Sequence, residues 1–545
     1  MRIAAIALLL RRFLLAWLLA VPALAAPAAA AGVDQALLAP LAGDDTDARL
    51  QAIAALGQLP DPGAAAVLQA LGNDRLYATA DGRVLIGPEG TGGRATDPST
   101  GAAVDLPADA GTISINNRLR RAIEAALAGS RLFSDNANER LDAARRLQQT
   151  GDPARLPMLE KALAAEKNEA VRGALAIAQA NLELKSEDPA KRRHAVQVLG
   201  DTKNAAFRPT LAALTQERDG VFAEPDPGVR EAAANALKQI DRHLATIEWA
   251  GNLFYGVSLG SVLLLAALGL AITFGLMGVI NMAHGELLMI GAYVTYVVQT
   301  VFRAWLPGWL DWYVVAALPL AFVVTALVGM ALERTVIRWL YGRPLETLLA
   351  TWGISLMLMQ GVRSLFGAQN VEVGNPSWMS GGVTVLGGLV LTYNRLVIIG
   401  FAFFVVFLVW ALLNHTRLGL FVRAITQNRR MADCVGVPTG RVDMLAFGLG
   451  SGIAGLAGVA LSQLGNVGPD LGRGYIVDSF MVVVLGGVGQ LAGTVIAALG
   501  LGGVNKFLEP YAGAVMAKIT ILVLIVLFVQ KRPQGLFAPK GRSVE

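Results

Sequence analysis

The sequence is poor in the residues that build covalent or metal-bound sites. Its 545 residues include one cysteine and four histidines. A single cysteine, Cys434, excludes a disulfide within the chain, and no Cys/His spacing of a structural zinc site can be assembled. The sequence also lacks the Gly-x-x-x-x-Gly-Lys-Ser/Thr run of a P-loop. We therefore expect no metal, no cofactor and no enzymatic activity of its own.

The chain also carries little charge for its length. Charged residues make up 16% and hydrophobic residues 54% of the sequence, and the mean hydropathy of +0.51 is above that of soluble globular domains. The net charge of +5 is not gathered into a basic face interleaved with aromatic residues, which argues against a nucleic-acid partner. A small excess of Lys and Arg is typical of the cytoplasmic loops of a protein in a lipid membrane.

The character of the sequence changes near residue 250, from charged and helix-forming to long apolar stretches. At the N-terminus, Arg2, Arg11 and Arg12 precede a short apolar run and an Ala-rich stretch, which is a signal-peptide pattern. An uncleaved anchor helix is the alternative, and either would export the segment that follows. We predict a signal peptide (1–31), an extracytoplasmic domain (32–248), a transmembrane domain (249–531) and a cytoplasmic tail (532–545).

The expected exported domain contains recurring helical units. Stretches rich in Ala and Leu recur at 48–56, 139–147, 192–199 and 226–237. Asp-Pro pairs beside three of them fit helix starts, with Asp as the cap and Pro in the first turn. The pattern predicts short amphipathic helix pairs that resemble HEAT-type repeats. Apolar runs at 76–79, 83–86 and 112–115 predict a small β insert. The surface of this domain either binds a partner or is a spacer.

The transmembrane domain contains apolar stretches long enough to cross a bilayer. They lie at about 252–275, 284–302, 313–332, 346–366, 388–413, 443–463, 475–502 and 513–530. An exported N-terminal domain and a cytoplasmic tail require an odd number of crossings, whereas these stretches number eight. Glycines at 486, 487, 489 and 493 indicate that the stretch 475–502 is broken or re-entrant. The predicted fold is all-α: a polytopic membrane bundle of about eight to nine spans, preceded by the helical repeat domain.

Polar side chains at membrane depth point to function because their burial in lipid is costly. Asn281, His284 and Glu286 stand at the start of the second apolar stretch. They either contact a transported solute or cap a helix start, where Glu favours the positive end of the helix dipole. Small residues in the sixth stretch predict close helix packing rather than contact with a solute. These residues are Gly448, Gly452, Gly455 and Gly458.

A basic loop follows the fifth apolar stretch and reads RAITQNRRMADCVGV over 423–437. Ala424, Asn428, Met431 and Val435 are spaced to form one face of a single short helix, which Gly436 would end. A short amphipathic helix outside the bilayer suits docking in a groove of a motor subunit. The alternative is a solvated loop whose arginines only set the topology.

Several separated motifs resemble those of branched-chain amino acid type ABC transporter permeases. They are GLMGVINMAHGE (275–286), the loop 423–436, VLGGVG (484–489) and PQGLF (533–537). The exported extension, with FGAQNVEV (366–373) and PSW (376–378), is similar to the first permease subunit of urea importers in that family. The resemblance covers roughly residues 250–540.

This resemblance implies a multi-pass protein of the bacterial inner membrane, with a periplasmic N-terminal domain and a cytoplasmic C-terminus. A periplasmic binding protein would deliver the solute, a second permease subunit would complete the pathway, and two cytoplasmic ATPase subunits would drive it. By analogy, the residues that couple to the ATPases are Arg423, Ala424, Asn428, Met431 and Gly436.

A pathway for urea should present amide or hydroxyl groups in an apolar wall, because urea is neutral and rich in donors and acceptors. Besides Asn281, His284 and Glu286, the candidates are Thr351, Ser355, Gln360, Gln463 and Asn466. Each of them could instead satisfy a neighbouring helix. Sparse charge within the spans favours a neutral solute over a zwitterion, so we expect urea. The alternatives are branched-chain or other amino acids, short amides, a stand-alone channel and a membrane-bound sensor.

Overall fold

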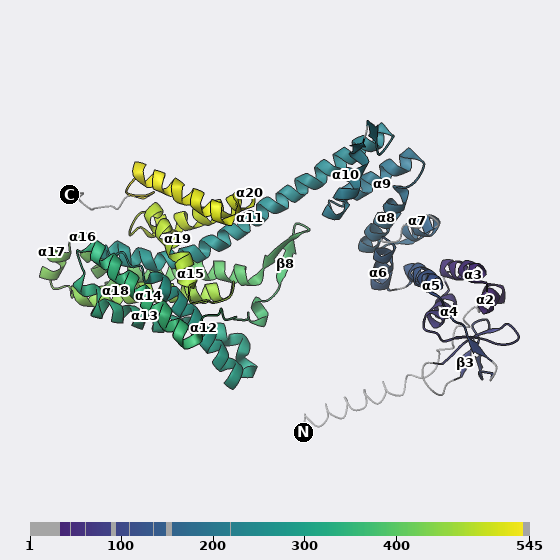
Figure 1. Cartoon of the computed structure of the whole chain (residues 1–545), viewed down its shortest axis with the longest axis horizontal. Helices are drawn as coiled ribbons and strands as arrows, with labels where there is room; N and C mark the ends of the chain where they lie inside the picture. Colours follow the sequence, from purple (N-terminus) through teal and green to yellow (C-terminus); the bar gives the residue numbers. More distant parts are fainter. Residues whose placement is uncertain are drawn as a thin grey trace, which may run out of the picture. The chain divides into compact units, whose positions relative to one another are not determined.

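The computed structural model describes residues 33–43, 45–59, 61–88, 94–107, 110–134, 136–148, 155–218 and 220–537. The predicted signal peptide and the end of the predicted tail lie outside these residues. The chain divides between His243 and Leu244 into two compact units, and we describe each by itself (Figure 1). The division falls within helix α11 (Pro227–Met277). The boundary expected at 248/249 lies in the same helix and stays a prediction.

Short helices make up most of the first unit. They are α2 (Gln35–Ala42), α3 (Thr46–Gln58), α4 (Pro62–Gly72), α5 (Asn117–Ser130), α6 (Ala137–Leu147), α7 (Leu156–Ala165), α8 (Glu169–Glu183), α9 (Pro189–Asp201) and α10 (Arg208–Thr215). Asp or Asn side chains cap the starts of several of them, as in α9, where Asp188 accepts from the N–H of Ala190 at 2.8 Å. All four Ala/Leu-rich stretches lie in helices, as predicted. Their grouping into HEAT-like repeats stays a prediction.

The predicted β insert is present between α4 and α5. It consists of β1 (Leu76–Ala78), β2 (Val84–Ile86), β3 (Ala95–Thr96), β4 (Ala103–Val104) and β5 (Gly111–Thr112). All neighbours in the order β4-β3-β2-β1-β5 pair antiparallel. Leu76, Val84 and Ile113 are buried in one core with residues of α2 to α5. The β insert and these helices therefore share a single hydrophobic core. A second hairpin, β6 (Glu217–Arg218) and β7 (Val221–Phe222), was not predicted.

One ion pair recurs along the helices of the first unit. Arg140 of α6 pairs with Glu166 at 2.7 Å, and Arg192 of α9 pairs with Glu224 at 2.7 Å. The two carboxylates are only 4% and 5% exposed. The hydrogen bond from Arg140 is the main reason that the pKa of Glu166 is lowered to about 2. A buried contact that repeats with the helices is what a repeat architecture would produce, which supports the HEAT-like interpretation.

We predict that Arg192→Ala destabilises the first unit by about 3–5 kcal/mol, because it leaves the buried carboxylate of Glu224 without its partner. Arg193→Ala is the matched control: its guanidinium is half-exposed and lies 3.7 Å from Asp226, and an exposed pair contributes about 1 kcal/mol at most. Hydrogen exchange of the α9 amides in the full chain measures the loss of stability in each of the two variants. Equal loss of protection in the two variants would contradict the prediction.

Long apolar helices dominate the second unit. After α11 come α12 (His284–Trp305), α13 (Tyr313–Thr335), α14 (Pro344–Phe366), α15 (Tyr393–His415), α16 (Arg417–Gln427), α17 (Arg429–Cys434), α18 (Thr439–Ser462), α19 (Leu471–Gly486) and α20 (Leu491–Lys531). Seven of the described helices are long and apolar enough to cross a membrane. The 16 residues of α19 are fewer than such a crossing normally needs.

Two of the predicted membrane stretches are not single helices in the structure. The stretch 475–502 is not one helix, because α19 ends at Gly486 and Gly487 takes a φ of +99° that only glycine adopts readily. The expected break at these glycines is therefore confirmed. The stretch 388–413 begins as a strand: β8 (Gly382–Val385) and β9 (Leu389–Thr392) form a hairpin before α15. The count of eight to nine spans stays a prediction.

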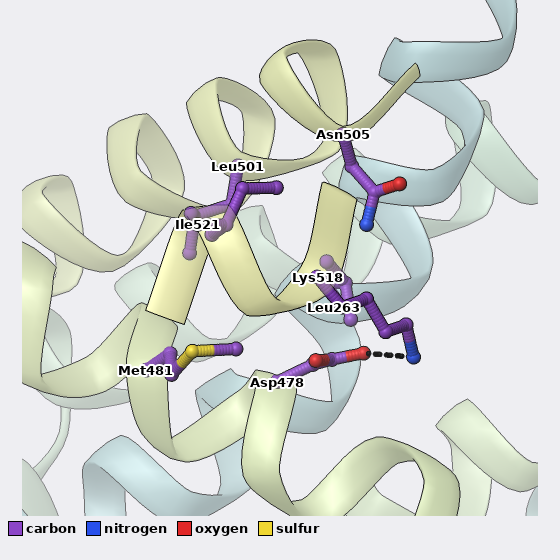
Figure 2. A pocket seen from close by; sticks show the side chains of 7 residues that line it. All are labelled: Leu263, Asp478, Met481, Leu501, Asn505, Lys518 and Ile521. Carbon is purple, nitrogen blue, oxygen red and sulfur yellow. Dashed lines mark hydrogen bonds and ion pairs between the residues drawn. The ribbon is translucent and has the colours of Figure 1, made fainter. Parts of the chain in front are cut away.

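Helix α20 folds back on itself. Gly513 interrupts it with a φ of +76°, three residues after Pro510. Figure 2 shows the consequence: residues from both sides of the break line one small pocket against α19. These residues are Leu501 and Asn505 before the break, and Lys518 and Ile521 after it. Lys518 also pairs with Asp478 of α19 at 3.0 Å. At about 10 Å³, the pocket holds about one water molecule.

Helix α18 lies at the centre of the second unit and is buried along most of its length. Its glycines allow backbones to approach closely. A Cβ at Gly450 would lie 2.6 Å from the carbonyl oxygen of Gly269 on α11, and one at Gly458 would lie 2.8 Å from the nitrogen of Ala292 on α12. Gly448, Gly452 and Gly455 similarly face α13. The prediction that these glycines serve helix packing is confirmed.

Candidate functional site

Helix α12 begins inside the bundle and not at its end. His284, the first residue of α12, donates from Nε2 to the carbonyl of Ala266 at 2.9 Å. Ala266 lies eleven residues before Met277, the end of α11, which is about 16 Å along a helix axis. Residues 278–283 must therefore run back into the bundle as irregular backbone.

The irregular segment 278–283 obtains hydrogen bonds from nearby side chains. Thr351 of α14 accepts from the N–H of Met282 at 3.2 Å, and Asn281 accepts from the N–H of Ala283 at 3.1 Å. Thr351 is fully buried and Asn281 is 2% exposed. Non-helical backbone at membrane depth is tolerated where protein surrounds it, and transporters place binding sites at such breaks.

Glu286 adds a carboxylate to this break. It is 1% exposed, and its Oε1 accepts from the hydroxyl of Ser355 at 3.0 Å. Its Oε2 finds no hydrogen-bond partner among the described residues, and the same holds for Asn281 Nδ2 and the hydroxyl of Tyr293. Buried polar groups are nearly always paired, so these three atoms leave hydrogen-bonding capacity for a ligand. Asn281, Glu286, Thr351 and Ser355 are named the polar cluster below.

A second helix start lies beside the polar cluster. A Cβ at Gly285 would lie 2.7 Å from the carbonyl oxygen of Gly472, the second residue of α19. The first turns of α12 and α19 therefore meet inside the bundle. Each helix N-terminus carries a partial positive charge, which favours the carboxylate of Glu286. Arg473 and Asp470 are the charged groups that act on Glu286 from the α19 side.

The structure brings only some of the predicted pathway residues close together. The four members of the polar cluster lie together, whereas His284 points to α11. Gln463 is buried at the end of α18, where it accepts from the hydroxyl of Tyr313 at 3.1 Å. Gln360 and Asn466 are exposed. Sequence reasoning missed Tyr293, although it follows Glu286 by seven residues and so shares its helix face.

The predicted coupling loop consists of two helices, so the prediction of a single helix is wrong. Asn428 separates α16 from α17 with extended backbone (φ −153°, ψ 99°). Its side chain accepts from the N–H of Met431 at 3.0 Å and so caps α17, a position that Asn prefers over a helix interior. Gly436 ends α17 with a φ of +85°, as predicted. Ala424 packs in the core of this segment, and Arg423 reaches Asn414 at 3.3 Å.

Helix α17 is held on one side and exposed on the other. Ala432 is buried against the segment core, and Arg429 forms an ion pair with Asp443 of α18. Met431 and Val435 are 61% and 72% exposed. They lie one turn apart, at i and i+4, and so share a face. An exposed apolar pair on a fixed helix is suited to contact another protein.

Apolar helices of membrane length packed around a buried polar cluster define a polytopic helical membrane protein. The comparisons with known proteins are more specific. The chain belongs to the family described as "Branched-chain amino acid transport system / permease component", whose pattern matches residues 252–529. It is a permease component, and the match covers the second unit from α11 to α20.

Two curated relatives align over the same region. The high-affinity branched-chain amino acid transport system permease protein BraD of Pseudomonas aeruginosa is 28% identical over 291 residues, which is 52% of this chain and 94% of that protein. The corresponding protein LivH of Escherichia coli K12 is 29% identical over 292 residues, with the same shares. The ribose import permease protein RbsC of Escherichia coli K12 is 31% identical over 134 residues, 23% of this chain and 42% of that protein.

We predict that Glu286→Gln leaves the chain as stable as the unmodified protein or about 1–2 kcal/mol more stable, because it removes a buried carboxylate that has only one partner. Transport should nevertheless fall, because one carboxylate oxygen of Glu286, a hydrogen-bond acceptor, becomes an amide nitrogen that can only donate. Thermal unfolding in detergent and solute uptake measure the two effects. The control Glu346→Gln changes a half-exposed carboxylate at the start of α14 and should alter neither. Reduced stability with normal uptake in Glu286→Gln would assign the residue a purely structural role.

Proposed function

We propose that this chain is the permease subunit of an ATP-driven importer that takes up urea across the bacterial inner membrane. The observation that carries the proposal is the combination of the family match with an exposed helix, α17, that is fixed to the central helix α18. The chain has no P-loop, so the energy must come from other subunits. Two ATPase subunits, a second permease subunit and a periplasmic binding protein complete the importer.

The contacts between helix ends support an odd number of crossings. At one end, Tyr341 contacts Met277 at 3.4 Å, and the N–H of Leu536 donates to Leu485 at 2.8 Å. At the other end, Tyr313 donates to the carbonyl of Gly374 at 2.6 Å. Counting α20 as two passes because of the break at Gly513, and α12 and α19 as passes that start inside the bundle, α11 to α15 and α18 to α20 support a count of nine.

The distribution of charge between the two ends supports a proposed orientation in the membrane. The end that contains Tyr341 also holds the arginines of 334–343 and of 417–441, and Arg532. The other end holds Trp305, Trp309 and Trp312, which are 81%, 64% and 58% exposed. Positive loops stay in the cytoplasm and tryptophans gather at the interface. This distribution supports a periplasmic first unit and a cytoplasmic tail.

The polar cluster is the proposed contact for the solute within this subunit. Urea offers N–H donors and one carbonyl acceptor. Glu286 has a free acceptor atom, and Asn281 and Tyr293 have free donors. The exported unit of this chain further favours urea, since the resemblance to urea importers rests on it.

A branched-chain amino acid is the second candidate solute. The names of the two aligned relatives favour it, and so does the neighbourhood of Glu286. Arg473 lies near enough to act on this carboxylate, and one cation beside one anion would suit a zwitterion.

The deciding experiment is uptake by the reconstituted importer. The chain is combined in proteoliposomes with the proposed second permease, ATPases and binding protein. We expect labelled urea to enter only with Mg-ATP, and excess leucine not to compete. Competition by leucine without urea uptake would favour the amino acid, and urea uptake by this chain alone would make it a channel.

We predict that Met431→Asp weakens binding of the ATPase subunit by about 2 kcal/mol or more, roughly 30-fold, because an apolar anchor of the docking face is lost. Val221→Asp is the control: it places the same charge at a residue of the first unit that is 70% exposed. Titration of the detergent-solubilised chain with labelled ATPase subunit gives both affinities. Equal affinities for the two variants would exclude α17 as the docking face.

A further inference from the structure

Arg429 contacts α18 directly and is connected to α13 through Tyr341. It is the first residue of α17, directly after the break at Asn428. Its guanidinium makes two hydrogen bonds to the carboxylate of Asp443 on α18, one of them at 3.4 Å. It also lies over the ring of Tyr341, 4.8 Å from the ring centroid. The hydroxyl of Tyr341 donates to Glu333 of α13 at 2.8 Å.

The carboxylate that pairs with Arg429 and the one that accepts from Tyr341 are both buried. Asp443 is 2% and Glu333 is 1% exposed, whereas the side chain of Arg429 is 41% exposed. Two buried like charges close to each other are unfavourable without a cation nearby. An arginine suits this position because its planar group makes a bidentate ion pair and stacks on an aromatic ring at the same time.

Helix α18 extends from this ion pair to the other end of the bundle. Its glycines allow close packing against α11, α12 and α13, so α18 cannot shift without moving its neighbours. At its far end, the side chain of Gln463 lies 3.1 Å from the hydroxyl of Tyr313, which donates to the carbonyl of Gly374 in the 367–381 loop. A displacement of α18 therefore reaches both ends of the bundle.

We propose that Arg429 is the positioning residue that transmits movement of α17 to α18 and α13. This inference rests on the proposed function, in which an ATPase subunit acts on α17. Its ion pair with Asp443 makes α17 and α18 move as one body, and its stacking on Tyr341 links α13 to the same movement. Without the pair, α17 would move alone about the break at Asn428.

The test compares two substitutions that each break an ion pair between helices. Asp443→Asn removes the pair with Arg429, whose half-exposed guanidinium stays solvated. Asp478→Asn, the matched control, removes the pair with Lys518 shown in Figure 2. In the complete importer in nanodiscs, we expect Asp443→Asn to hydrolyse ATP normally while solute transported per ATP falls about tenfold, a usual size for coupling between sites. Asp478→Asn should keep the unmodified ratio.

An unchanged ratio in Asp443→Asn would overturn the proposal. If that variant does not assemble, Arg429→Lys decides, because lysine keeps the charge but loses the bidentate geometry. A normal ratio in Arg429→Lys would then overturn it. Absence of ATP-driven uptake in the unmodified importer would instead refute the proposed function.

A distance measurement separates transmission from a merely structural role. Cys434, the chain's one cysteine, is exposed at the end of α17, and Leu445 is exposed on α18. Spin labels at Cys434 and at Leu445→Cys should keep a constant separation through the ATP cycle. With Asp443→Asn added, we expect the separation to change when ATP binds. A constant separation in that variant would contradict the proposal.

Discussion

The second unit depends on the requirement that every backbone polar group at membrane depth be satisfied within the protein. Regular helices meet this requirement by themselves, but the segment 278–283 does not. It obtains its hydrogen bonds from Thr351 and from its own Asn281. Because the chain supplies these partners, α12 can start inside the bundle, and this start brings Glu286 and Ser355 together.

Close helix approach is the second condition for this arrangement. An irregular segment can be enclosed at membrane depth only where the neighbouring helices pack closely around it and exclude lipid. The glycines of α18 supply that contact, and Gly285 and Gly472 bring the first turns of α12 and α19 together. Small residues thus serve packing, while the neighbouring polar atoms keep their hydrogen-bonding capacity. The same rigid contact makes α18 suitable to carry a displacement through the bundle.

The few buried charges of the second unit lie at its ends or at the polar cluster. Asp443 forms an ion pair with Arg429, which also lies over the ring of Tyr341, and the hydroxyl of Tyr341 donates to Glu333. Glu286 and Glu333 each have one hydrogen-bond partner and one oxygen without any among the described residues. In a low-dielectric interior a satisfied network makes a structure rigid, and an unsatisfied group is costly. The bonded arginine of Asp443 has no counterpart at Glu286 among the described residues, and this difference separates the proposed link to the ATPases from the proposed contact with the solute.

Local patterns in the sequence determined much of the architecture. Apolar length predicted the membrane helices, Asp-Pro and Ala/Leu patterns predicted the helices of the first unit, and glycines predicted the break after α19. These features depend on neighbours in the chain, so a sequence shows them directly. Asn281, Glu286, Thr351 and Ser355 could be selected as polar residues in apolar surroundings, but their grouping could not be predicted.

Tertiary structure alone decided which of the selected residues meet. Thr351 and Met282 are 69 residues apart in the sequence, and so are Ser355 and Glu286. The spacing of residues within one helix does not predict contacts over such a separation. The same holds for Arg429 with Tyr341 and for the break at Asn428, where side-chain capping replaced the helix that the spacing predicted. The physical reason is that the spacing of residues reports on one element, whereas a buried ion pair or hydrogen bond depends on how several elements pack.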